Sequence, residues 1–119
     1  MLVVLTASGA AHHGSAEYHV DREITVSGTV KEWKWTNPHT WVVLTVPRAA
    51  GGGDEWNGEG PPLSWAAARG WSNTTLKPGE QVRVIMYPSR TQARGGLVKR
   101  IEPAGRDALN VSRPWLETR

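Results

Sequence analysis

The sequence predicts an all-β domain, a small five-stranded barrel with one short helix between its third and fourth strands. Thirteen glycines and eight prolines among 119 residues favour many short strands joined by turns. Segments in which apolar and polar residues alternate indicate strands that bury one face. The length suits one domain with one modest core, so we expect no second domain.

An alternating run predicts the first strand, with apolar or glycine positions at Ile24, Val26, Gly28 and Val30. The glycine in its middle indicates a bend. Trp33 and Trp35 continue the alternation one position out of step, so we expect a bulge near Lys31 or Glu32.

Asn37 and Pro38 predict a turn, and the β-branched and aromatic run at residues 40–46 predicts the second strand, which ends at Pro47. A glycine-rich hairpin loop at residues 49–54 separates it from a short third strand around residues 55–57.

Two prolines at residues 61–62 can begin a helix, which we expect to run over residues 63–69 and to stop at Gly70. Residues 81–87 and 97–101 then predict the fourth and fifth strands. A helix placed between strands three and four of a five-stranded sheet fits an OB-like barrel, and closing the barrel removes exposed sheet edges.

Residues 1–11 are apolar and then rich in small side chains, as in a signal peptide, and they are too short to span a bilayer. No basic segment precedes them in this sequence, so two alternatives stay open: the true start lies upstream, or the segment is an ordinary buried strand. We expect a leader at 1–11, the barrel at 12–105 and a loosely ordered tail at 106–119. The protein would then be periplasmic or secreted and not integral to a membrane.

The chain has no cysteine, so any metal site must use nitrogen or oxygen ligands. The formal net charge is +3, but the basic residues are spread along the chain, which is weak support for nucleic-acid binding. The cations that a basic groove would use are Lys31, Lys34, Arg83, Arg90, Arg94, Lys99 and Arg100.

Two short motifs are distinctive, Ala-His-His at residues 11–13 and Thr-Asn-Pro-His-x-Trp at residues 36–41. These motifs resemble those of a family of small exported bacterial proteins of unknown function. Tyr18, Arg-Gly-Trp at residues 69–71 and Leu-Lys-Pro-Gly-Glu at residues 76–80 add to the resemblance. Glu59-Gly60 also looks like an acidic-glycine pair of that family. The resemblance covers residues 11–105 and implies export and this fold, but no particular activity.

All four histidines lie in the first third of the chain, at His12, His13, His19 and His39. Neutral imidazoles bind Cu(II), Zn(II) and Ni(II), and copper leads the affinity order. If Ala11 is the first residue, its amine, two backbone amides and His13 can surround Cu(II) or Ni(II). If His12 is first, its amine and ring can chelate copper.

His39 follows a proline-fixed turn and supplies a third imidazole if the N-terminal segment folds back over that end of the barrel. We therefore predict a metal site at His12, His13 and His39. The alternative is that paired terminal histidines are solvated and that His39 donates to a carbonyl to lock its turn. Further binding candidates are His19, Asn37, Trp35, Trp41 and Glu59.

No nucleophile elbow, phosphate loop or convincing carboxylate pair is recognisable, so we expect no catalysis. The leading hypothesis is an exported, non-enzymatic binding domain that holds a transition metal, Cu(II) before Zn(II) or Ni(II), and no organic cofactor. The alternative is a periplasmic adaptor or structural envelope protein that binds protein or glycan without metal. We expect such a partner rather than nucleic acid.

Overall fold

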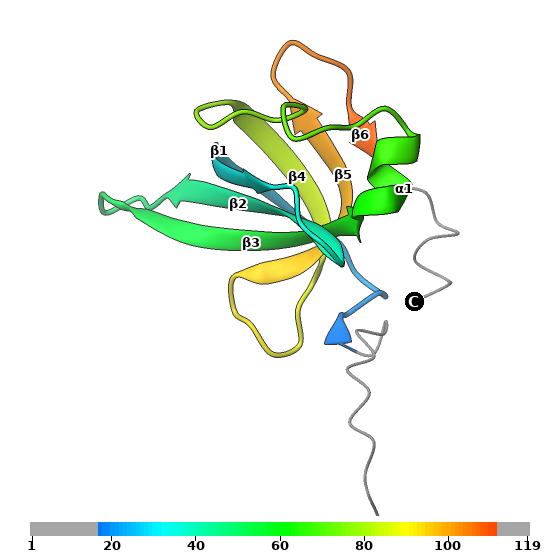
Figure 1. The fold of residues 1–119 in the computed structure, drawn as a ribbon. Coiled ribbons are helices and arrows are strands. Elements are labelled where there is room, and N and C mark those ends of the chain that lie inside the picture. The colour runs from blue at the N-terminus through cyan, green and yellow to red at the C-terminus, as the bar shows by residue number, and fades with distance from the viewer. Residues whose placement is uncertain (1–16, 112–119) are drawn as a thin grey trace, which may run out of the picture.

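Residues 17–111 are described by a computed structural model, and they fold into a closed β-barrel (Figure 1). Its strands are β1 (Ile24–Lys34), β2 (His39–Pro47), β3 (Gly53–Pro62), β4 (Gln81–Pro88), β5 (Gly95–Pro103) and β6 (Leu109–Asn110). They lie in the order β3-β2-β1-β4-β5-β6. Parallel pairing of residues 57–59 with 95–97 closes the barrel, which confirms the predicted OB-like fold.

The bulge predicted in the first strand is present, because the register of β1 against β2 shifts between Val30 and Glu32. The extra residue, Lys31, exchanges the two faces of the strand. Val30 is therefore buried before the bulge and Trp33 after it. A Cβ at Gly28 would lie 2.6 Å from the carbonyl oxygen of Thr45, so only glycine allows this close approach of β1 to β2.

The third strand is longer than the sequence predicts, since β3 pairs with β2 along nearly its whole length, from Gly53 to Pro62. Its three glycines and two prolines have low strand propensity, and pairing on both sides outweighs that preference. A Cβ at Gly58 would lie 2.7 Å from Val98 and 2.9 Å from Val42, so this glycine lets β3 press against the core.

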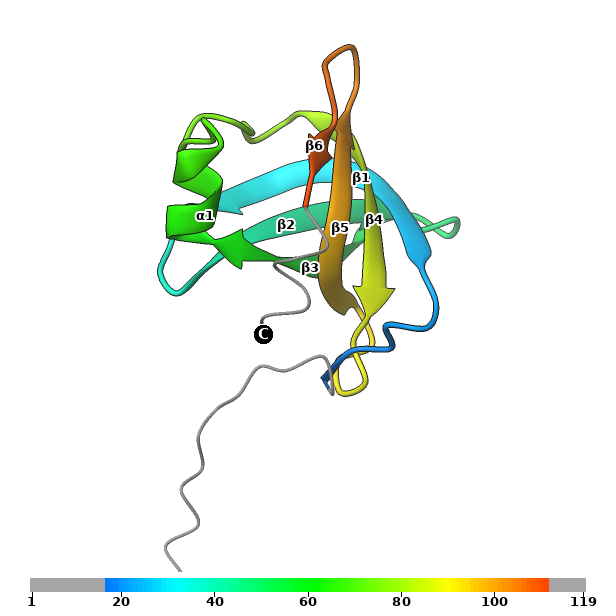
Figure 2. The ribbon, with the colours of Figure 1, turned by 90° about the vertical axis from the view of Figure 1, so that its right-hand side faces the viewer.

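The predicted helix is α1 (Leu63–Ala68), which lies at one end of the barrel, away from the turn that joins β2 and β3 (Figure 2). Pro62 is its N-cap, and Gly70 follows the helix with a φ of +84°, as expected for a stop signal. Trp65 and Trp71 meet edge to face at 5.8 Å and pack against the core, which holds the helix in place.

The described residues continue past 105, the expected end of the barrel. Leu109–Asn110 forms β6 against Arg100 and Ile101 of β5, and Val111 is buried. Residues 112–119 of the expected tail, and the expected leader at 1–11, lie outside the described residues. No helix among residues 17–111 is long and apolar enough to cross a bilayer.

Candidate functional site

The most unusual residue of the barrel is Glu59, a carboxylate with only 1% of its surface exposed. Gly58, its neighbour in β3, faces Val42 and Val98 in the core. Because side chains alternate along a strand, Glu59 projects from the opposite, outer face of the barrel wall. A buried carboxylate is costly unless it is hydrogen-bonded or paired, so its partners define a site.

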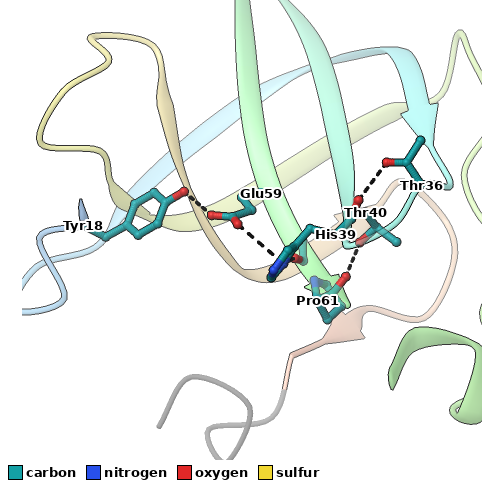
Figure 3. Close-up of polar contacts among 7 residues, drawn as sticks. Tyr18, Thr36, His39, Thr40, Glu59 and Pro61 are labelled. Atoms are coloured by element: carbon teal, nitrogen blue, oxygen red, sulfur yellow. Dashed lines mark hydrogen bonds and ion pairs between the residues drawn. The ribbon is translucent and has the colours of Figure 1, made fainter. Parts of the chain in front are cut away.

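The first partner is Tyr18, whose hydroxyl donates a hydrogen bond to Oε2 of Glu59 (Figure 3). Tyr18 is buried and precedes β1, where it forms an isolated bridge with Ser89. The next amide, at His19, donates to the carbonyl of Pro88 at 2.8 Å and fixes this segment beside the end of β4. The segment before the first strand is thus part of the site.

The second partner is His39, the first residue of β2. Its Nδ1 lies 3.1 Å from the carbonyl oxygen of Gly60 and 3.5 Å from Oε1 of Glu59. A carbonyl oxygen only accepts hydrogen bonds, so Nδ1 carries a proton; in the neutral form of the ring this tautomer has its lone pair on Nε2. Figure 3 shows Tyr18 and His39 approaching Glu59 from opposite sides.

The turn before β2 positions His39. Its Asn37–Pro38 peptide bond is cis, and the hydroxyl of Thr36 donates to the carbonyl of His39 at 2.7 Å. Of the His39 side chain, 17% is exposed. The imidazole is therefore held on one edge by β3 and retains some access to solvent.

Gly60 completes the support of the site from β3. A Cβ there would collide with the hydroxyl of Thr40, which is itself fully buried and donates to the carbonyl of Pro61 at 2.9 Å. The acidic-glycine pair Glu59-Gly60 thus has a physical basis, with one residue providing the carboxylate and the other the close approach of the two strands.

The structure brings together two of the predicted site residues, His39 and Glu59, and adds Tyr18, which sequence reasoning did not name as a site residue. The only signal for Tyr18 was its place among the motifs of the resembling family. His12 and His13 lie outside the described residues. Within residues 17–111 no three histidine or acidic side chains are grouped so as to hold a metal ion, so a site at His39 needs further ligands.

The other candidates lie apart from this pair or serve the fold. His19 joins no group of potential metal ligands among the described residues. Asn37 is exposed in the cis-proline turn, and Trp35 packs against the core 6.2 Å from Trp33. Trp41 is opposite Glu59 in the register of β2 and β3 and lines a small hollow with Tyr18.

The basic residues that a nucleic-acid groove would use are largely engaged with carboxylates. Nζ of Lys31 lies 2.8 Å from Oε2 of Glu55. Hydrogen bonds, the larger from Arg83 and the smaller from Arg100, hold the pKa of Glu102 below its usual value. The last two arginines line a shallow hollow of about 710 Å³ on β4 and β5. The hollow is lined by three arginines, Arg83, Arg100 and Arg106, and by two carboxylates, Glu102 and Asp107, so most of its positive charge is opposed within the hollow itself.

Comparison with known families gives a match to one family model over residues 1–99. The chain belongs to the family of unknown function DUF6152. Membership of a family of unknown function, as the sequence predicts, is thus confirmed, while export stays a prediction. Comparison of this DUF6152 chain with curated proteins gives no match.

Among solved structures, the DUF6152 barrel is similar to Rim1, a mitochondrial single-stranded DNA-binding protein of S. cerevisiae. The TM-score is 0.53 at 14% identity, and the alignment covers 70% of this chain and 93% of Rim1. A selenomethionine-labelled crystal of Rim1 gives a TM-score of 0.45, also at 14% identity, with 76% and 97% of the two chains covered. At this identity, the first likeness shows the OB fold alone.

Proposed function

We propose that this protein is an exported, non-enzymatic domain that binds a transition metal, Cu(II) in preference to Zn(II) or Ni(II), through His12, His13 and His39. The observation that carries the proposal is the hydrogen bond from Nδ1 of His39 to the carbonyl of Gly60. Histidines that bind metals commonly donate their second ring nitrogen to a carbonyl or carboxylate, which fixes the tautomer and the ring plane. Here Glu59 adds a carboxylate on the same edge of the ring.

The polarity of the site favours a cation. Glu59 lies 3.5 Å from Nδ1 of His39, so its negative charge increases the electron density that the ring offers at Nε2. Tyr18 stabilises the charge of the buried carboxylate by donating to its other oxygen. The pair Glu59 and Tyr18 would then orient the metal ligand without binding the metal itself.

The remaining ligands would come from the N-terminal segment. Tyr18 is anchored at the site by its hydrogen bond to Glu59. His12 and His13 precede Tyr18 by only a few residues in the sequence, so the chain is long enough for them to reach the site. One imidazole from the barrel and two from the chain terminus supply nitrogen ligands in the number and type that Cu(II) prefers.

Isothermal titration of the protein with Cu(II) tests this proposal, with the chain beginning at Ala11 or at His12. We expect one-to-one binding that weakens at least tenfold in His39→Gln, which keeps a polar side chain but removes the imidazole. His19→Gln is the matched control and is expected to bind as the parent does, since His19 joins no ligand group among the described residues. Equal affinities for the parent and both variants would refute the proposal.

A further inference from the structure

The shallow hollow on β4 and β5 is a second candidate site. Its volume of about 710 Å³ falls within the range of about 300–1,000 Å³ in which proteins bind small molecules. Its lining includes Ser27 of β1, Arg83 of β4 and Glu102 of β5, which are neighbours across the three strands. Val82 and Ile101, the residues that precede Arg83 and Glu102, are buried in the core, so alternation turns Arg83 and Glu102 outward.

The positive part of this hollow consists of Arg83 and Arg100, which share one carboxylate. Nε of Arg83 donates to Oε1 of Glu102 at 2.8 Å, and Nε of Arg100 donates to Oε2 at 3.1 Å. Nη1 of Arg100 also donates to Oδ1 of Asn110 at 2.7 Å. Both Nη groups of Arg83 and Nη2 of Arg100 make no hydrogen bond to another described residue. Two guanidinium groups against one carboxylate leave one positive charge in excess, with N–H donors suited to a further carboxylate.

The negative part of the hollow is Asp107, in the turn that joins β5 to β6. Asp107 is exposed, and its carboxylate forms no ion pair or hydrogen bond with another described residue. The neighbouring Arg106 is engaged elsewhere, because its Nη2 donates to Oε2 of Glu80 at 2.7 Å. The amide of Ala104 donates to the carbonyl of Gln81 at 3.0 Å. These two contacts hold the turn that carries Asp107 against the start of β4, and a preformed site loses less entropy when it binds a ligand.

From this distribution of charge we infer that the hollow binds a short peptide by its two free termini, with the carboxylate at Arg83 and Arg100 and the ammonium group at Asp107. A zwitterion complements a lining that offers one excess positive charge and one carboxylate without a partner among the described residues. The volume of the hollow is more than a single amino acid fills, so a peptide of a few residues fits better. Pro47 and Ala108 add apolar surface for the peptide to contact.

The same lining disfavours two other classes of charged ligand. A polyanion such as a nucleic acid needs several unopposed cations, whereas Glu102 and Glu80 oppose the arginines of this hollow. A quaternary ammonium group such as that of choline has no N–H donor for Asp107 and is bound by aromatic rings. Among the described residues no aromatic side chain lines the hollow. A ligand with an ammonium group and one carboxylate therefore fits best.

Titration of the ¹⁵N-labelled full chain with trialanine, followed by NMR and without added metal, tests the inference. N-acetyl-trialanine lacks the ammonium group, and trialanine amide lacks the carboxylate. We expect trialanine to cause saturable shifts of the amide signals of the residues that line the hollow. Each capped peptide should bind about fivefold more weakly, which is the scale of one charge pair close to solvent.

Two variants assign each end of the peptide to its residue. Asp107→Asn should weaken trialanine binding about fivefold and remove the preference over the N-acetylated peptide. Arg83→Gln should have the same effect on trialanine and remove the preference over the amide. Asp21→Asn and Arg90→Gln are the matched controls, because they remove an exposed carboxylate and an exposed guanidinium group that do not line the hollow. Both controls should bind trialanine as the parent does, and the amide spectrum of each variant shows whether it is folded.

Several outcomes overturn the inference. They are the absence of any shift at millimolar trialanine, equal affinities for the capped and free peptides, or full discrimination retained in both Asp107→Asn and Arg83→Gln. Tighter binding of O-phosphoethanolamine than of trialanine would point to a phosphate zwitterion and would also overturn it. The result is independent of the proposed metal site, because no copper is added and His39 does not line this hollow.

Discussion

The hydroxyl of Tyr18 donates a hydrogen bond to the buried carboxylate of Glu59, 41 residues further along the chain. Both residues are almost inaccessible to solvent, and Tyr18 belongs to the hydrophobic core cluster. Glu59 also lies beside Nδ1 of His39, so its carboxylate contacts both the segment before β1 and the first residue of β2. The arrangement is a buried polar network, and the contribution of each of its residues to stability can be measured by substitution.

Tyr18→Phe should destabilise the protein by about 1–3 kcal/mol, because a buried carboxylate loses a hydrogen-bond donor while the packing of the ring is kept. Urea unfolding followed by tryptophan fluorescence measures the change. Tyr87→Phe is the control, since no described residue bonds the Tyr87 hydroxyl, and it should alter the free energy of unfolding by less than about 0.5 kcal/mol. Equal effects of the two variants would contradict the assigned role of Tyr18.

Glu59→Gln should weaken Cu(II) binding about 10–100-fold, because the amide keeps the shape of the side chain but removes the charge that orients and polarises His39. Calorimetric titration measures the loss. Glu23→Gln removes an exposed carboxylate that pairs with Lys99 and should bind copper as the parent does. Unchanged copper affinity in Glu59→Gln would show that Glu59 does not support the metal ligand.

Gly60→Ala should cost about 1–3 kcal/mol of stability, because its Cβ would collide with the hydroxyl of Thr40. In a Thr40→Ala background that hydroxyl is absent, so the same substitution should cost less. The coupling energy of the double-mutant cycle, measured by urea unfolding, should be at least about 0.5 kcal/mol. Additive effects would mean that the strands do not approach as closely here as described.

The ion pair between Glu80 and Arg106 should make stability depend on pH. Burial raises the pKa of Glu80, but hydrogen bonds from Arg106 and from the amide of Lys77 outweigh it and hold the pKa below 4.5. A carboxyl whose pKa is depressed by folding stabilises the protein above its unfolded pKa, and the contribution is lost as pH falls through the folded value. Glu80→Gln should therefore destabilise by up to about 1 kcal/mol at pH 7, and by less near pH 3.

Thermal unfolding of the parent and Glu80→Gln at both pH values gives this comparison. A difference between the two proteins that stays constant from pH 7 to pH 3 would contradict the expected sign.

Much of the fold could be predicted because it depends on local patterns. Alternation located β1, and the change of phase between Val30 and Trp33 located its bulge. Two features depend on contacts distant in the sequence and left no local pattern. The two-residue strand β6 is too short to show alternation, and the extent of β3 is set by its pairing with β2 and β5 rather than by its own propensity.

The site was predictable only in parts. His39 and Glu59 could be named from residue type and motif, but their proximity follows from the register of β2 and β3, in which Trp41 is opposite Glu59 and His39 is opposite Pro62. Spacing along the chain does not determine that register. Tyr18 lies outside the regular strands, so no periodicity could assign its direction toward Glu59.

Pulsed electron paramagnetic resonance of the Cu(II)-loaded protein, with its histidines labelled with ¹⁵N, tests the proposed metal site most directly. The measurement counts the imidazoles bound to copper and identifies them by substitution. We predict coupling to imidazole nitrogen that loses one contribution in His39→Gln and none in His19→Gln. Spectra that are identical for the parent and His39→Gln would show that copper does not bind His39 and would contradict the proposed function.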